Sequence, residues 1–203
     1  MRNKQKEPLK LVGRGVVLEE IRPEYFEPVI RWRNDPGLNH FLNQPESLTM
    51  EMETSWYENC YLPDDTQGFL VMVDKKSGVP FGTIGWTDMD IQRRQCVGGR
   101  LLLGNPAYRN SGQFMESFFV FGDYLYQFVD CLYGHVGVKN RRAIYLNKML
   151  GYHPNEGTIE YPEELYVKGD HSRPQTEYMR TREEYEQMKA RLLPTLSAIL
   201  YED

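Results

Sequence analysis

The spacing of hydrophobic residues along the chain changes from two to about 3.6 at Gly104-Asn105-Pro106. Before this point, short apolar runs are separated by polar turns, which is typical of β-strands. After it, from Phe114 to Phe128, large apolar residues recur every three or four positions and predict a long helix with a wide, mostly buried face. A strand that leads through a glycine-bearing loop into a buried helix restricts the chain to folds in which helices cover a sheet.

The same two patterns predict the remaining elements. Strands are expected over residues 16–21, 69–73, 81–86, 96–103 and 132–138, with a last hairpin over 158–160 and 176–180. Further helices are expected over residues 22–33, 49–60 and 141–150, and after the capping box Thr181–Glu184. Pro28 is expected to split the first of these helices in two. The order predicts the α+β class, with a mixed and mostly antiparallel central sheet flanked by helices.

Length and composition predict one ordinary globular domain. The chain has 203 residues, of which 40% are hydrophobic and 26% charged, so it can bury a core of its own without metals or disulfides. Residues 1–10 are expected to form a flexible polar tail, and residues 11–203 a single domain.

Charge, cysteine content and hydropathy exclude several classes of protein. A net charge of −5 argues against a nucleic-acid partner, and no apolar run approaches the roughly 20 residues that cross a membrane. The charged start of the chain does not resemble a signal peptide. Three widely spaced cysteines argue against a disulfide framework and suit the cytoplasm. We expect a cytoplasmic monomer or homodimer that binds neither membranes nor nucleic acid.

The segment from Leu101 to Gly112 is a strand, a loop and the start of a helix. The first backbone N–H groups of a helix lack partners and carry partial positive charge, so they can bind a phosphate that approaches closely. Arg109 can add a cation to such a site. The alternative is a plain turn between strand and helix that needs Gly112 only for its conformation.

A second informative segment runs from Val138 to Tyr152. Ala143, Leu146 and Leu150 fall on one side of the predicted helix and form its core stripe. Asn140 and Asn147 lie at the edge of that stripe. An asparagine at the start of a helix is most often an N-cap, which is the simpler interpretation of Asn140.

Together these segments resemble the signatures of the GNAT superfamily of N-acetyltransferases. Arg109 and Gly112 match its Arg/Gln-x-x-Gly-x-Gly/Ala motif. Asn140, Ala143 and the run Leu150-Gly151-Tyr152 match its second motif, Asn-x-x-Ala/Ser followed by Leu-Gly-Phe. The resemblance looks closest to the branch that acetylates amino sugars, small amines and ribosomal-protein N-termini, and it implies a GNAT-like form of the mixed sheet.

The resemblance implies acetyl-coenzyme A as co-substrate. Its diphosphate would lie on the backbone amides of six consecutive residues: Arg109, Asn110, Ser111, Gly112, Gln113 and Phe114. Its pantetheine arm would pair with the strand edge at Leu101, Leu102 and Leu103, and Asn140 would hold the arm or a water. No metal is expected, because the four histidines show no metal-binding spacing.

Three positions depart from the family pattern. Phe114 replaces a small residue and would either crowd the diphosphate or turn into the core. Asn147 stands where members often have a tyrosine that protonates the leaving thiolate, and Val97 where many have a carboxylate. The acid and base are therefore open. Asp88, ranked first, and Asp90 and His135 are the candidate bases; the simpler interpretations are turn residues and a sheet histidine.

The function expected is an acyl-coenzyme A-dependent N-acetyltransferase that acts on the primary amine of a small molecule. A nucleotide-linked amino sugar is the first choice of acceptor, and Arg31, Arg33, Arg93 and Arg94 could supply a basic patch for it. The acidic balance instead favours a cationic acceptor, which keeps a polyamine or a protein N-terminus as the alternative. A different class, a non-catalytic coenzyme A-binding module, would explain the missing acid and base.

Overall fold

The computed structural model describes residues 4–42, 44, 47–155 and 175–201. Eight strands form one sheet in the spatial order β1-β2-β3-β4-β5-β6-β8-β7. The strands are β1 (Lys10–Val12), β2 (Val16–Glu20), β3 (Gly68–Asp74), β4 (Pro80–Asp90), β5 (Gln95–Leu103), β6 (Cys131–Gly137), β7 (His153–Pro154) and β8 (Gln175–Thr181). The α-helices are α1 (Phe26–Asn34), α2 (Met50–Trp56), α3 (Gly112–Leu125), α4 (Arg141–Met149) and α5 (Arg182–Tyr201). The expected α+β class with a mixed, mostly antiparallel sheet is confirmed.

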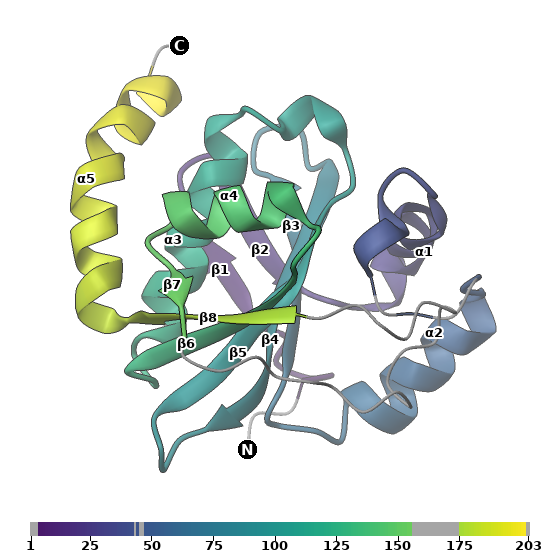
Figure 1. Cartoon of the computed structure of the whole chain (residues 1–203). Helices are drawn as coiled ribbons and strands as arrows, with labels where there is room; N and C mark the ends of the chain where they lie inside the picture. The colour runs from purple at the N-terminus through teal and green to yellow at the C-terminus, as the bar shows by residue number, and fades with distance from the viewer. Residues whose placement is uncertain (1–3, 43, 45–46, 156–174, 202–203) are drawn as a thin grey trace.

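Each face of the sheet carries its own hydrophobic core. On one face, side chains of α3 and α5, such as Phe118 and Tyr185, pack against Leu70 of β3. On the other, Trp32 of α1 packs in a second core that includes Val71, the next residue of β3. Side chains alternate between the faces along a strand, which is why neighbouring residues of β3 serve different cores. Figure 1 shows α3, α4 and α5 on one side of the sheet, and α1 with α2 on the other.

Strands β5 and β6 separate in the middle of the sheet. They share only a short parallel ladder of three residue pairs, of which the last is Val97–Tyr133. Beyond this pair, β5 stays paired with β4 as far as Leu103, and β6 stays paired with β8 as far as Gly137. Each strand therefore presents one backbone edge that does not pair with the other, and we call this opening the fork.

Helix α3 begins and packs as its sequence predicts. The Ser111 side chain caps it by accepting a hydrogen bond from the Phe114 backbone N–H at 3.1 Å. Nine of its residues are buried, including Phe114 and Phe118. Since Phe114 lies in the core, its ring does not face the loop ahead of the helix.

A buried glutamate of α3 fixes the turn between β1 and β2. The Glu116 carboxylate accepts hydrogen bonds from the backbone N–H groups of Arg14, Gly15 and Val16 at 2.6, 2.8 and 3.1 Å. A Cβ at Gly13 would lie 2.9 Å from this carboxylate, so the glycine is needed for the close approach. The amides of this glycine-bearing turn therefore bind the chain's own side chain.

Two predicted helices differ in detail. The expected break at Pro28 is wrong, because α1 begins at Phe26 after a 3-10 turn at Pro23–Tyr25. Pro28 thus lies in the first turn of α1, where its missing N–H would have no helical partner. The helix expected over 49–60 is α2 only as far as Trp56 and continues as a π-helical turn over Tyr57–Tyr61.

The start of the chain is held against the domain from residue 4 onward. The Lys4 Nζ, a buried group, donates to the backbone oxygen of Tyr61 at 2.8 Å. The Leu9 N–H donates to Glu20 Oε2 at 2.6 Å, and Lys10 opens β1, a strand that we did not predict. The described part of the expected tail, residues 4–10, is therefore hydrogen-bonded to the domain at Lys4 and Leu9 and joins the sheet at Lys10. The expected strand over 158–160 lies outside the described residues, and β8 pairs with β6 and β7.

Trp32 depends on a glycine at the end of β5. A Cβ at Gly104 would lie 2.0 Å from the Trp32 ring, whereas a Cβ at Gly99 would meet no atom within 4 Å. Gly104→Ala should push α1 off the sheet and lower the free energy of unfolding by about 1–3 kcal/mol, which is typical of overpacking. Gly99→Ala is the matched control and should change it little. Thermal unfolding measures both, and equal melting temperatures would contradict this account of α1 packing.

Candidate active site

Glycines line the start of the fork on both strands. β5 passes through Gly98 and Gly99 directly after the last pair with β6, and β6 passes through Gly134. Arg100 then adopts a left-handed backbone conformation, with φ +53°, where the register between β4 and β5 shifts. The Thr83 Oγ1 holds this bulge by donating to the Arg100 carbonyl oxygen at 2.7 Å. A bulge of this kind turns the strand and re-aims its edge.

The strand segment predicted to hold an extended arm leaves its edge toward the fork open. Leu102 is buried in the core under α1 and α2, while Leu101 and Leu103 pack against the core under α3. The side chains of these three leucines therefore pack in the cores, and only their backbone faces the fork. Leu102 and Leu103 pair with Thr83 and Gly82 of β4, and no described strand pairs with the opposite edge.

The loop ahead of α3 offers three unused backbone donors. The N–H groups of Arg109, Ser111 and Phe114 already donate within the loop. Those of Asn110, Gly112 and Gln113 have no hydrogen-bond acceptor among the described residues. These three donors at a helix N-terminus, with the exposed Arg109 side chain nearby, form the surroundings that a diphosphate requires.

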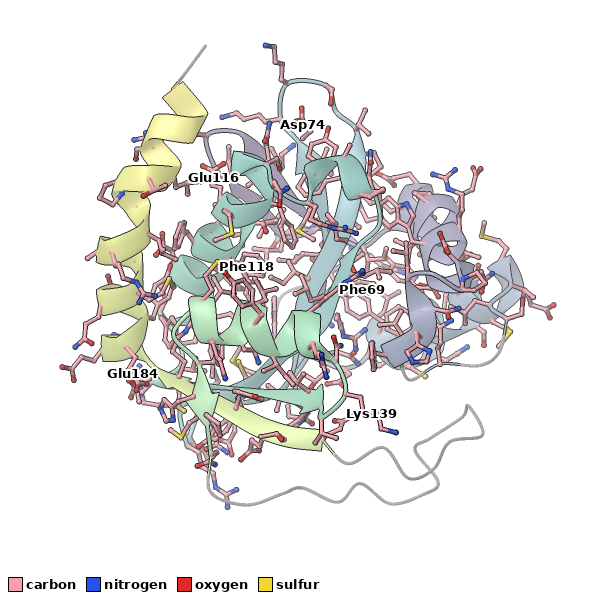
Figure 2. All side chains as sticks on the ribbon, turned by 45° about the horizontal axis from the view of Figure 1, so that its top comes forward. Phe69, Asp74, Glu116, Phe118, Lys139 and Glu184 are labelled. Carbon is pink, nitrogen blue, oxygen red and sulfur yellow. The ribbon has the colours of Figure 1, made fainter. Side chains whose placement is uncertain are left out.

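Two carboxylates flank the first turns of α3 without occupying these donors (Figure 2). Glu116 binds the β1–β2 turn. Asp74 accepts from Ser77 and Lys76 backbone N–H groups, and from Gln113 Nε2 at 3.2 Å. Burial acts to raise the pKa of Asp74, but hydrogen bonds from Ser77 and Lys76 outweigh it and hold the pKa below its usual value. The Gln113 side chain is therefore fixed to β3.

Helix α4 begins at the predicted asparagine. The Asn140 Oδ1 accepts from the Ala143 N–H at 3.1 Å, so this side chain is an N-cap, and its Nδ2 amide is not used in the cap. Asn147 lies about two helical turns further along α4. Its backbone oxygen accepts a hydrogen bond from the Tyr152 N–H at 2.9 Å. No side-chain hydrogen bond of Asn147 occurs among the described residues.

The hydroxyl of Tyr152 lies beside the fork, a position that the sequence does not predict. A Cβ at Gly98 would lie 3.9 Å from this hydroxyl. The Arg180 guanidinium lies 4.2 Å from the centre of the Tyr152 ring. Burial raises the pKa of Tyr152, so the hydroxyl keeps its proton at neutral pH. The sequence shows Tyr152 only as the aromatic end of a helix motif, and its approach to Gly98 depends on packing between distant segments.

His135 lies on β6 beyond the last pair with β5, and a glutamate orients it. Its Nε2 is 3.1 Å from Glu177 Oε2, and the two residues are directly opposite on β6 and β8. Asn155 Nδ2 donates to the other oxygen of Glu177 at 2.6 Å. Because Leu132 points into the α3 core, alternation places His135 on the α1–α2 face of the sheet. Glu177 was missed because the register between β6 and β8 cannot be derived from either segment alone.

Asp88 and Asp90 lie at the far end of β4. Asp88 is exposed, has a left-handed backbone with φ +55°, and accepts from Thr87 Oγ1 at 2.6 Å. Asp90 caps the β4–β5 turn by accepting from the N–H groups of Gln92 and Arg93, both at 2.9 Å. Strand β5 separates both aspartates from β6, and they stand beside the paired end of β5 rather than beside the fork.

The motif around Trp32 is mainly structural. Trp32 anchors α1 on Gly104, and Asn34 exchanges two hydrogen bonds of 2.8 Å with the backbone of Leu48. Arg33 instead points toward Glu53 of α2, which is buried. Glu53 was not singled out from the sequence, although its position three residues before Trp56 places both on one face of α2.

The described part of the chain shows neither a cluster of metal ligands nor a membrane-spanning helix. No group of three or more His, Cys, Asp or Glu side chains is placed there to hold a metal ion. Of the helices seen, none has the length and apolar character needed to cross a membrane.

Comparison with known proteins identifies the family. The family model described as "Acetyltransferase (GNAT) domain" matches residues 16–153. A search of curated proteins found no match at its significance threshold.

Solved structures share the fold at low sequence identity. A GCN5-related N-acetyltransferase from Brucella melitensis is 17% identical with a TM-score of 0.77, over 97% of this chain and 87% of that one. Spermidine N-acetyltransferase from Vibrio cholerae, solved with coenzyme A and spermine, is 13% identical with a TM-score of 0.71, over 86% and 99%. FdhC, described as a nucleotide-linked sugar GNAT, is 13% identical with a TM-score of 0.71, over 94% and 99%.

The family match spans more than half of the chain and includes the loop ahead of α3, the fork and α4. The chain therefore belongs to the GNAT acetyltransferases, a family of acyl-coenzyme A-dependent N-acetyltransferases.

Proposed function

We propose that this protein transfers the acetyl group of acetyl-coenzyme A to the primary amine of a small molecule, with an amino sugar as the first candidate acceptor. The observation that carries the proposal is the fork. Unused donors at the N-terminus of α3 lie on the α3 face of the sheet, and the His135–Glu177 pair lies on the α1–α2 face.

The residues present fit acetyl-coenzyme A. The backbone amides of Asn110, Gly112 and Gln113 would hold the diphosphate together with the Arg109 side chain. The backbone amides of Arg109, Ser111 and Phe114 already donate hydrogen bonds within the loop. The open edge of β5 at Leu101–Leu103 would pair with the pantetheine arm, and the Asn140 amide would hold the arm or a water. When bound, the co-substrate supplies an acetyl thioester, whose carbonyl carbon takes the amine and whose sulfur leaves as a thiolate.

His135 is the proposed proton acceptor for the attacking amine, ahead of Asp88. It lies on β6 beyond the point where β5 departs, whereas Asp88 lies behind the paired segment. The Glu177 carboxylate can only accept from Nε2, so Nδ1 is the ring nitrogen without a proton in the neutral imidazole. Glu177, held by Asn155, acts as a positioning residue that also stabilises the charged ring.

The leaving group needs little help. A thiol has a pKa near 8.5, so a thiolate departs without a strong acid. Asn147, which stands where members often have a tyrosine, is not required as a proton donor. The Tyr152 hydroxyl beside Gly98 keeps its proton at neutral pH, so it could donate a hydrogen bond to the departing sulfur without giving up that proton.

The chemical identity of the acceptor is a separate part of the proposal. Among the similar proteins, one is named as a spermidine N-acetyltransferase and another as a nucleotide-linked sugar GNAT. A polyamine or a protein N-terminus remains the alternative acceptor for this chain. The three cysteines are unpaired, which suits the cytoplasm as the place of reaction.

Coenzyme A should raise the melting temperature of the protein, because a ligand that binds only the folded state stabilises it. At a hundredfold excess over Kd the gain is about 2.7 kcal/mol, which corresponds to a rise of roughly 5–10 °C for a chain of this size. Gly112→Glu places a negative charge among the three donors and should abolish the rise. Gln92→Glu adds the same charge in the exposed β4–β5 turn and should leave it intact. If millimolar coenzyme A gives no shift with the unmodified protein, the proposed binding mode fails.

His135→Gln should lower kcat at pH 7 by roughly a hundredfold or more, the usual contribution of a general base. The deficit should shrink at high pH, because an amine with a pKa near 10 is then already neutral. Glu177→Gln should show a smaller loss of the same kind. The control is His153→Gln, since His153 also pairs with a glutamate, Glu184 at 3.0 Å, but is exposed. Steady-state rates across pH decide the matter, and an unchanged kcat in His135→Gln would remove His135 from the mechanism.

A further inference from the structure

Three charged side chains meet on the α1–α2 face of the sheet. Glu53 of α2 is only 1% exposed, and its Oε2 lies 3.7 Å from Arg33 Nη1, too far for a hydrogen bond. The charges of Arg33 and of Arg100 on β5 both act on this carboxylate. Burial raises the pKa of Glu53, and the two guanidinium groups oppose that effect. The cluster thus combines two cations with one buried carboxylate.

Two atoms of this cluster have no hydrogen-bond partner among the described residues. They are Oε1 of Glu53 and Nε of Arg100, and both are buried. Buried polar atoms are almost always hydrogen-bonded, and charged groups are the costliest to leave unpaired. The cluster thus contains one unpaired acceptor, Glu53 Oε1, and one unpaired donor, Arg100 Nε–H, and a group that both donates and accepts hydrogen bonds would pair with the two.

The Arg100 guanidinium is held rigidly in this place. One of its terminal nitrogens donates to Gln67 Oε1, and its central carbon lies 5.2 Å from the ring centres of both Trp56 and Phe69. Phe69 stands at the start of β3 on the side of the molecule where α1 and α2 pack (Figure 2). Trp56 shares its face of α2 with Glu53, so the arginine on the sheet and the glutamate on the helix approach each other where α2 packs on the sheet.

The cluster is connected to the fork through Arg100 itself. The Arg100 backbone lies three residues beyond Val97, the last residue of β5 that pairs with β6. Its side chain runs from there to α2. Gly99 beside it is exposed, with no atom within 4 Å of the place of a Cβ. His135 projects from β6 on this same face. Arg100 therefore links the backbone at the fork to the charged cluster on the α1–α2 face.

The two unpaired atoms determine which chemical group of an acceptor would fit between them. An ammonium would satisfy Glu53 but would face two guanidinium groups, and a carboxylate or phosphate would satisfy Arg100 but would face Glu53. A hydroxyl can donate to Glu53 Oε1 and accept from Arg100 Nε–H at the same time. A neutral hydroxyl is the group that matches both.

We infer that Glu53 and Arg100 form a subsite for a hydroxyl of the acceptor, which makes the substrate a hydroxylated amine rather than a polyamine. This rests on the proposed function, because it assigns the part of the acceptor that lies away from the reacting amine. The subsite determines specificity and takes no part in proton transfer.

The test compares three amines of different chemistry: glucosamine, cyclohexylamine, which has the ring but no hydroxyls, and spermidine. The protein loaded with coenzyme A should bind glucosamine more tightly than either of the others in calorimetric titrations. Initial rates with acetyl-coenzyme A should give the same order of kcat/KM. Glu53→Gln should reduce the ratio of kcat/KM for glucosamine over cyclohexylamine by about tenfold to a hundredfold, because a buried hydrogen bond to a charge is lost. Glu51→Gln, an exposed position on the same helix, is the matched control.

Arg100→Lys provides a second variant in case the buried Glu53 change prevents folding. It keeps a positive charge and removes the Nε donor, so it should also lower the ratio. If the protein acetylates or binds all three amines equally, or if both variants keep the ratio of the unmodified protein, the subsite is overturned while acetyl transfer stands. If no amine is acetylated, the proposed function fails, and the titrations still decide the subsite, since equal or absent glucosamine binding overturns it.

Discussion

The separation of β5 from β6 leaves two central strands of one sheet without a full set of hydrogen-bond partners. A sheet normally pairs every backbone edge inside it, because an unpaired N–H or C=O away from water is costly. Here β5 stays with β4 and β6 stays with β8, so two central strands leave edges open to each other beyond Val97 and Tyr133. Such edges require a partner that is not part of the sheet, and an extended arm lying in the fork would supply one.

The elements around the fork divide the work between the two faces of the sheet. On the α3 side, the capping of Phe114 by Ser111 and the capture of the β1–β2 turn by Glu116 leave three amides pointing out of the helix N-terminus. On the α1–α2 side, the charged groups are glutamate, arginine and histidine side chains that mostly pair with one another. The first side suits an anion, and the second suits a polar molecule that exchanges a proton. This division is what a reaction between a coenzyme thioester and an amine needs.

Local features of the fold could be predicted from the sequence, and long-range pairings could not. The Thr181–Glu184 capping box marks a helix start through contacts within four residues, so the local sequence alone identifies it. The pattern from Phe114 onward likewise identifies the buried face of α3. Pro28 was misjudged because the start of α1 depends on a 3-10 turn ahead of it. β1 was missed because Lys10–Val12 is too short to show a period.

For the site, the same limit applies. The loop from Leu101 to Gly112 and the N-cap Asn140 carry their own motifs. Glu177 becomes relevant only through its register with His135, 42 residues away, and Glu53 only through α2 packing over β5. The position of the Tyr152 hydroxyl at the fork becomes clear only from its contact with Gly98, a residue far away in the sequence. Each of these pairs joins segments whose separation in the sequence carries no information about their contact.

We propose that coenzyme A binds along the open edge of β5 and on the unused amides of α3. The most direct measurement is the amide ¹H–¹⁵N spectrum of the protein as coenzyme A is added. We expect the largest shifts at Asn110, Gly112 and Gln113 and along Leu101–Leu103. The amides of Arg14 and Gly15, in the turn bound by Glu116, should be much less affected. Shifts confined to other parts of the chain, or none at saturating coenzyme A, would contradict it.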